Sequence, residues 1–335
     1  MIPRMSFFAI LFALLIEQVK PPSPTHPLHG VLRNWAGWIS ENFDAGRAQH
    51  GWIAWSLAVL LPAVASVAIY WALASVSVVL AFLWNMAVLY FTLGFRQFSH
   101  HFTDIREALD SGDEALARTL LARWQQVDAS ELPRSEIVRH AIEHSVLAAH
   151  RHVFGVLCWF SVLSALGLGP AGAVVFRMAE FVQRYWKRAA ALEGASSALC
   201  SAAGRAWHAI DFIPARATAL GFAVVGSFED AIDCWRNYAQ RFPDDNDGVI
   251  LAATSGAVNV RLGGEALKPS LVGELDGATA FAAEALGAHA AEDTESTPGR
   301  EPEPAHLRSI VGLVWRSVVL WMLLIALLTL AHLIG

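Results

Sequence analysis

The last stretch of the chain, VGLVWRSVVLWMLLIALLTLAHLIG (Val311–Gly335), decides the class of fold. Its only charged residue is Arg316, and the residues from Ser317 to Leu330 carry no charge at all. About 20 apolar residues are needed for a helix to cross the hydrocarbon of a bilayer. The stretch is therefore expected to be a transmembrane helix.

The composition of the whole chain agrees with a membrane environment. Of the 335 residues, 55% are hydrophobic and only 16% are charged, whereas soluble domains average about 25% charged residues. The formal net charge of −6 argues against a nucleic-acid partner, which would favour a clustered basic surface. Three scattered cysteines form neither a metal-ligand spacing nor an even-numbered disulfide framework.

Three further apolar segments are expected to enter the membrane. The segment from Trp52 to Leu93 has no charged residue and is long enough for two helices, folded at Trp71 to Ser77. The run Phe7 to Ile16 is interpreted as a short first helix, because no cleavage site of a signal peptide follows it. The glycine and proline cluster Gly167–Gly172 predicts a hairpin whose arms of about 15 residues favour a shallow or re-entrant insertion.

The segments between these spans are more polar. Arginines between Arg96 and Arg151 and a basic cluster after the glycine turn favour a cytoplasmic position for both. Thr103 to Gln126 has helical periodicity, interrupted at Asp110–Asp113, and predicts a helical hairpin. Residues 284–306 are acidic and proline-rich, which predicts a flexible tether.

We therefore expect an all-α, polytopic integral membrane protein with re-entrant or hairpin helices and cytoplasmic helical segments. Its expected parts are N-terminal membrane helices at 1–94 with a loop at 17–51, a cytoplasmic helical segment at 95–151, a membrane hairpin and re-entrant core at 152–283, an acidic linker at 284–306 and a C-terminal transmembrane helix at 307–335.

The stretch RHAIEH (Arg139–His144) contains the spacing H-x-x-E-H of one class of zinc hydrolases. On a helix, His140, Glu143 and His144 would share one face. A zinc enzyme also needs a third ligand and a positioned base. We therefore interpret the spacing as a coincidence on a polar helix and expect no metal site.

The stretch DFIPAR (Asp211–Arg216) places an acid and an arginine around Pro214, next to an apolar run. Such charges are costly in a membrane unless they are paired or functional. Two interpretations stay open. Asp211 and Arg216 pair with each other and hold a turn where the chain re-enters the membrane, or Arg216 binds an anionic group of a ligand.

These motifs resemble the CobD/CbiB–AmpE superfamily of membrane proteins. IDFIPARATALGFAVVG is similar to the D-x-x-P-x-R segment of that superfamily, and His26-Pro27 follows the first span as in CobD/CbiB. The tract SGAVNVRLGGEALKPSLVG, with Gly263-Gly264 and Lys268-Pro269, resembles the C-terminal glycine element of the family. The central segments AHRHVFGVLCWF and FRQFSHHFTDIREALDSGDEALAR are more similar to AmpE.

The CobD/CbiB resemblance implies a multi-pass protein of the bacterial inner membrane that takes part in cobalamin biosynthesis. It implies ATP-dependent amide formation between aminopropanol, or its phosphate, and a corrinoid, with ATP and Mg²⁺ as cofactors if the chain is catalytic. The residues that carry over are Glu143 and Asp211 as catalytic candidates and His26, Arg216, Lys268, His140 and His144 as substrate-binding candidates. The expected partners are the lipid bilayer, a corrinoid and other proteins of the pathway.

The chain departs from the family pattern at charged positions. In the E-x-x-x-E-N-x-x-D pattern only Glu143 is kept, since Arg139, His144 and Leu147 stand at the other places. Trp207 and His208 replace two acids ahead of Asp211. An AmpE-like, non-catalytic sensor or regulatory protein of the inner membrane is therefore the alternative function. Transport is a weaker third interpretation, because the sequence has no inverted repeat.

Overall fold

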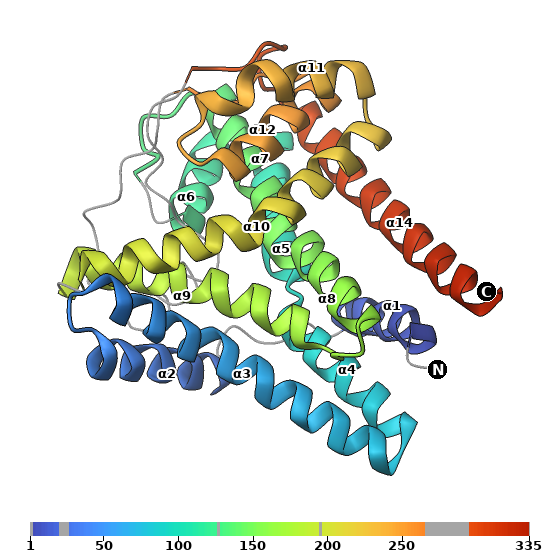
Figure 1. Ribbon diagram of the computed structural model, residues 1–335. Helices are drawn as coiled ribbons and strands as arrows, with labels where there is room; N and C mark the ends of the chain where they lie inside the picture. Colours follow the sequence, from blue (N-terminus) through green and yellow to red (C-terminus); the bar gives the residue numbers. More distant parts are fainter. Residues whose placement is uncertain (1–2, 20–26, 126–127, 194–195, 265–294, 335) are drawn as a thin grey trace. The chain divides into compact units, whose positions relative to one another are not determined.

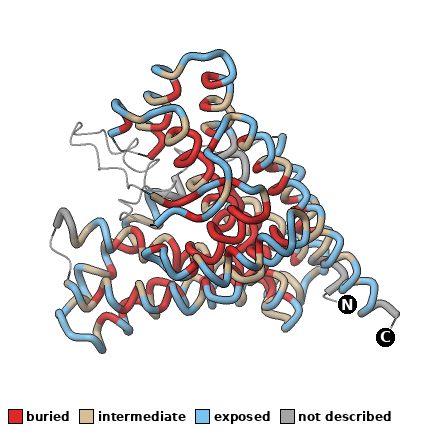
Figure 2. The backbone as a smooth tube through the Cα atoms, turned by 90° about the horizontal axis from the view of Figure 1, so that it is seen from above, coloured by how far each residue is buried: buried red, intermediate tan, exposed pale blue. Residues whose placement is uncertain are grey.

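The computed structural model describes residues 3–19, 27–125, 128–193, 196–264 and 295–334 (Figure 1). The described residues form helices joined by short connections, and their extended pairing is limited to one bridge between Val260 and Arg300. Figure 2 shows that buried and exposed positions alternate along most helices, as expected where each helix turns one face to its neighbours. The all-α prediction is confirmed.

Four helical stretches within the described residues are long and apolar enough to span a membrane. They are Ala48–Val76, Arg134–Ala165, Ser197–Val225 and Pro304–Ala331. The last of these contains most of the C-terminal run from which the membrane class was predicted. Shorter apolar helices cover Phe7–Val19 and Val78–Thr92. The re-entrant and cytoplasmic placements stay predictions.

The described chain divides into two compact units, each built from distant parts of the sequence. Unit 1 comprises Met1–Gly94, Arg151–Pro214 and Leu324–Gly335, and unit 2 comprises Phe95–His150 and Ala215–Leu323. The helices α10 (Ser197–Val225) and α14 (Pro304–Ile334) contribute residues to both.

Unit 1 is organised around α3 (Ala48–Val76), which packs against α2 (Pro27–Phe43), α4 (Val78–Thr92) and α9 (Ala171–Glu193) (Figure 1). α1 (Pro3–Val19) packs on α4, and α8 (Gly155–Ala165) packs on α9. Glycines allow the last pair to approach closely: a Cβ on Gly172 would lie 1.9 Å from the carbonyl oxygen of Trp159.

The break between α3 and α4 occurs at Ser77. This residue has an extended backbone, and its hydroxyl accepts a hydrogen bond from the amide of Val79, which caps α4. The predicted fold of the Trp52–Leu93 segment at Trp71–Ser77 is confirmed. The predicted turn at Gly167–Gly172 is confirmed as well, because α8 ends at Ala165 and α9 begins at Ala171.

Unit 2 contains three helices from the middle of the chain: α5 (Phe95–Asp110), α6 (Glu114–Gln125) and α7 (Arg134–Ala149). The predicted hairpin with its break at Asp110–Asp113 is therefore confirmed. A second group consists of α11 (Phe228–Tyr238), the short helix η2 (Ala239–Arg241) and α12 (Asp245–Val258). α11 packs tightly on α12, and the closest approach is at Gly256, beside the carbonyl oxygen of Asp230.

Two helices continue where a break was expected. α7 runs through a single π-helical turn, η1 (His150–Phe154), into α8, so that the first arm of the glycine hairpin belongs to a helical stretch of 32 residues rather than about 15. α10 continues through Pro214, so the predicted turn at this proline is wrong. Proline removes one backbone hydrogen bond within a helix, and helices in membrane proteins tolerate that loss.

Part of the expected acidic tether is bound to the rest of unit 2. Thr297 donates its amide to the carbonyl oxygen of Leu262 (2.7 Å), and Arg261 donates to that of Arg300 (2.8 Å). Residues 295–303 therefore run beside the segment that follows α12 and lead directly into α14.

Candidate functional site

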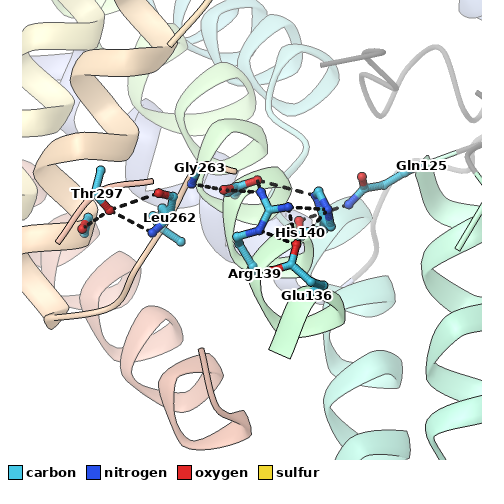
Figure 3. A network of polar contacts seen from close by, with 9 residues as sticks. Gln125, Glu136, Arg139, His140, Leu262, Gly263 and Thr297 are labelled. Atoms are coloured by element: carbon cyan, nitrogen blue, oxygen red, sulfur yellow. Dashed lines mark hydrogen bonds and ion pairs between the residues drawn. The ribbon is translucent and has the colours of Figure 1, made fainter. Parts of the chain in front are cut away.

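The charged side chains of RHAIEH lie on one face of α7. Glu136, Arg139 and Glu143 are spaced three and four residues apart, a spacing that brings helical side chains together. The Arg139 side chain is only 4% exposed, and its guanidinium lies between the two carboxylates (Figure 3). Its Nε donates to Glu136 at 2.8 Å, and its Nη1 donates to both oxygens of Glu143 at 3.2 Å.

Glu143 also binds a glycine turn that is 120 residues away in the sequence. Its Oε1 accepts the amide hydrogen of Gly263 at 2.7 Å (Figure 3). Gly263 and Gly264 have φ angles of 78° and 130°, which residues other than glycine rarely adopt. The glycines therefore let the backbone present an N–H to the largely covered carboxylate of Glu143.

Two buried hydroxyl groups, those of Thr297 and Ser255, stabilise this turn through hydrogen bonds. The Thr297 hydroxyl accepts the amide of Leu262 at 2.9 Å and lies 2.7 Å from the Ser255 hydroxyl. The Ser255 hydroxyl can also reach the carbonyl oxygen of Val260 at 2.8 Å. A continuous set of polar contacts thus runs from α12 through the turn to α7. We refer to Glu136, Arg139, Glu143 and the Gly263 amide as the Arg139 cluster.

The two histidines of the motif border the Arg139 cluster differently. The Nε2 atom of His140 lies 2.8 Å from Nη2 of Arg139, and Gln125 donates to the backbone oxygen of His140 at 3.1 Å. The ring of His144 instead packs edge-on against Trp124, with centroids 4.4 Å apart. His101 stacks on the same indole, and burial lowers the pKa of His101 despite the nearby carboxylate of Asp104.

The Arg139 cluster does not fit a magnesium ion or a zinc ion. Both of its carboxylates are hydrogen-bonded to the guanidinium of Arg139. This fixed positive charge lies where a metal ion would have to bind. Among the residues that the structure describes, no group of three or more His, Cys, Asp or Glu is placed to hold a metal. Within the zinc-like spacing, Glu143 therefore pairs with Arg139, whereas His144 packs against Trp124.

The DFIPAR motif lies on α10, with its two charges in different units. Asp211 is completely buried in unit 1, where its neighbour Ile210 accepts a hydrogen bond from the Trp159 indole. Arg216 belongs to unit 2 and donates to the amide oxygen of Asn246 at 2.9 Å. Five residues correspond to about 500° of helix rotation, so the two side chains leave the helix in different directions. The interpretation of Arg216 as a ligand-binding residue stays a prediction.

Asn246 is positioned by the start of α12. The carboxylate of Asp244 accepts the amides of Asn246 and Asp247, which is the usual capping arrangement at a helix N-terminus. A second polar contact in unit 2 joins Nδ1 of His150 to the Thr218 hydroxyl at 2.8 Å, and both residues are buried. His150 begins the π-helical turn, a feature that often occurs at functional sites.

The structure brings together only some of the predicted site residues. Glu143 and His140 share one network. His144 directly follows Glu143 but packs against Trp124, and Arg216 and Asp211 lie on α10. His26 and Lys268 lie outside the described residues.

The residues of these networks that sequence reasoning missed include Glu136, Thr297 and Asn246. Glu136 could have been found, since it stands three residues before Arg139 on the expected helix. Thr297 and Asn246 carry no such signal, because their contacts join segments that are distant in the sequence.

Comparison with known proteins gives a consistent result. The family model described as "CobD/Cbib protein" matches residues 7–276. The cobalamin biosynthesis protein CobD of Stutzerimonas stutzeri (strain A1501) is 30% identical over 325 residues, which cover 95% of this chain and 96% of that protein. The protein of the same name from Chromobacterium violaceum is 33% identical over 198 residues, covering 58% of this chain and 60% of that protein. No solved structure matches significantly.

Proposed function

Because this chain belongs to the CobD/CbiB protein family, we propose that it acts in cobalamin biosynthesis as an amide synthase of the bacterial inner membrane. In the proposed reaction, a side-chain carboxylate of a corrinoid takes a phosphoryl group from ATP. The amine of aminopropanol or of its phosphate then forms a C–N bond with the activated carbon and loses a proton, and the former carboxylate oxygen leaves in inorganic phosphate. The apolar helices support a multi-pass membrane location.

One observation connects the proposed function with particular residues. The hydrogen bond between Gly263 and Glu143 joins the two distant stretches on which the family resemblance rests, the glycine element and the one acid kept in the helical pattern. If both stretches bind the same substrate, they must lie next to each other, and this hydrogen bond supports such a site.

We assign Glu143 the role of binding and orienting the amine. Its side chain is 16% exposed, so it is accessible to a small ligand while most of its surface is covered. A carboxylate offers about four acceptor positions, which leaves capacity for a substrate N–H beside the bonds to Arg139 and Gly263.

The other predicted residues complete the proposal. His140 and His144 would line the approach to Glu143, and Arg216 would hold an anionic group, because a guanidinium has five donors and can bind Asn246 and a ligand together. His26 and Lys268 are kept as substrate-binding candidates, and Asp211 as the second catalytic candidate. We assign no step to a metal ion, since the carboxylates of the Arg139 cluster are held by a guanidinium.

The proposal is tested with purified protein in detergent, supplied with ATP, Mg²⁺, a corrinoid acid and aminopropanol or its phosphate. We expect amide product from the unchanged chain, a loss of at least tenfold on Glu143→Gln, and little change on Glu131→Gln, which alters an exposed glutamate before α7. The variants Asp211→Asn and Arg216→Met test the remaining candidates in the same assay.

Complementation of a bacterial strain that lacks this step gives a second readout. Growth that depends on the corrinoid should return with the unchanged gene. If the chain is present in the membrane but neither growth nor amide product appears, the proposal is wrong and the AmpE-like, non-catalytic alternative takes its place.

A further inference from the structure

The two ends of α3 carry exposed tryptophans at a distance that matches a bilayer. Trp52 is 39% exposed and Trp71 is 56% exposed. The 19 residues between their positions correspond to about 28 Å of helix, close to the hydrocarbon thickness of about 30 Å. Tryptophan is enriched at both membrane interfaces.

The surface of α3 between the two tryptophans is suited to lipid. Its exposed side chains there are large and apolar: Ile53, Leu60, Leu61, Val64 and Ile69. The sequence has no charged residue from Trp52 to Gly94.

The α8–α9 turn marks the Trp71 end independently. The Trp71 indole donates to the carbonyl oxygen of Gly167 at 3.0 Å. Gly169 has a φ of 56°, and a Cβ placed on it would lie 2.5 Å from the ring of Tyr70. The polar backbone of a turn cannot face hydrocarbon without cost. The turn and Trp71 therefore belong at the same water-facing edge.

Basic side chains gather at the Trp52 end. The guanidinium of Arg205 lies 5.7 Å from the centre of the Trp52 ring, and Arg205 is exposed. Along α9, Lys187 follows Ala171, the first residue of the helix, by 16 residues, or about 24 Å of helix, and is exposed together with Arg188. This second helix therefore reaches its first exposed cations after a rise similar to that between the two tryptophans.

We propose that the bilayer covers unit 1 as a band whose edges lie at Trp52 and at Trp71, with the Trp52 edge on the cytoplasmic side. The orientation follows from the basic residues at the Trp52 edge, since positively charged residues favour the cytoplasmic face. The stretch from Gly155 to Phe176, which contains the α8–α9 turn, has no charged residue at all.

The band places an ion-pair network at mid-membrane depth. Glu180 follows Ala171 by 9 residues, or about 14 Å of helix, which is near the middle of the band. Glu180 is 1% exposed and binds Arg177 at 2.6 Å and Arg184 at 2.8 Å. Charges at this depth are expected to face the protein interior and to pair with each other. This burial reconciles the charged sequence of α9 with a membrane location.

The proposal is tested by labelling single introduced cysteines with a maleimide that does not cross membranes. The variants are Ala45→Cys beyond the Trp52 edge, Leu61→Cys in the middle of the lipid-facing surface and Ser75→Cys beyond the Trp71 edge; all three positions are exposed. Labelling is measured in spheroplasts, before and after permeabilisation, above the level of the unchanged chain.

We expect Ser75→Cys to be labelled in intact spheroplasts and Ala45→Cys only after permeabilisation. Leu61→Cys should stay unlabelled in both and react only after denaturation in detergent. Labelling of Leu61→Cys in the native membrane would overturn the band, and reversed labelling of the other two positions would overturn the orientation. Neither result depends on amide synthase activity, so the band and the proposed function stand or fall separately.

Discussion

At the scale of single residues, Arg139 has the most consequential surroundings. Its guanidinium is almost completely buried and contacts Glu136, Glu143 and His140. A buried ion pair is a weak source of net stability, because desolvation offsets the attraction. Removing Arg139 is nevertheless costly, because Glu136 and Glu143 lose their hydrogen bonds to it while much of their surface stays covered.

The variant Arg139→Ala is therefore expected to reduce the free energy of unfolding by about 1–3 kcal/mol, since two partly exposed carboxylates would lose their shared cation. The control is Arg308→Ala, which removes an exposed ion pair with Asp110 and should cost about 0–1 kcal/mol. Thermal melting of the protein in detergent measures both. Similar melting temperatures for the two variants would contradict the expectation that the burial of Arg139 makes its ion pairs more important for stability than the exposed pair of Arg308.

Asp44 provides a test in terms of pH. Burial raises the pKa of Asp44, but the hydroxyl and the amide of Ser196 donate to its carboxylate and outweigh that effect, so the pKa is lowered from its usual 3.8. A carboxyl whose pKa is lower in the folded state stabilises the protein above the unfolded pKa. This stability is lost as the pH falls through the folded value.

The variant Ser196→Ala should therefore melt at a lower temperature than the unchanged chain at pH 5–6, by an amount that corresponds to about 1–2 kcal/mol. The difference should shrink below about pH 4, as Asp44 becomes protonated in both proteins. A series of melting curves between pH 3 and pH 6 measures it. A difference that does not change with pH would rule out the charged hydrogen bond as its source.

At the scale of elements, close contacts at glycines decide how the helices of unit 1 pack. Gly167 and Gly169 both adopt positive φ angles in the α8–α9 turn, of 81° and 56°. Their surroundings differ: a Cβ on Gly167 would meet nothing within 4 Å, whereas one on Gly169 would overlap the Tyr70 ring.

Gly167→Ala should therefore cost about 1–2 kcal/mol, the penalty of a left-handed conformation for a residue with a Cβ. Gly169→Ala pays the same penalty and must also displace Tyr70, so its melting temperature should be the lower of the two. Tyr70 is only 3% exposed, so Tyr70→Ala is destabilising on its own. In a double-mutant cycle, Gly169→Ala should nevertheless cost less in the Tyr70→Ala background than in the unchanged chain. Equal melting temperatures for the two single variants would show that the turn does not press against Tyr70.

Helix continuity was the least predictable property of the elements. Glycines and Ser77 ended helices where the sequence indicated, because a local backbone preference acts there. Pro214 did not end α10, and the polar stretch before Val153 did not end the helix that runs from α7 into α8. In both places the neighbouring helices decide, since packing overrides a local preference of a few kcal/mol.

At the scale of the whole molecule, the chain has four described helical stretches that are apolar enough to span a membrane. Their exposed side chains include many leucines and valines that water would solvate poorly, such as Val64, Val319 and Leu328. Lipid is the solvent that suits this surface.

The intact chain is accordingly expected to stay in the membrane pellet after an alkaline carbonate wash and to be released only by detergent. A soluble cytoplasmic protein of the same cells serves as the control and should appear in the supernatant. Recovery of the folded chain from the aqueous fraction would contradict the membrane assignment.

The sequence by itself determined the all-helical membrane class, the helix breaks at Ser77 and Gly167–Gly172, and the family. These follow from hydropathy and from backbone preferences, which act over a few residues and need no knowledge of the fold. Only the tertiary structure decided that Glu143 binds Gly263, that Arg216 binds Asn246 and that Thr297 holds the turn. Each of these contacts joins residues at least 30 positions apart, and such pairs leave no mark in local periodicity because packing alone brings them together.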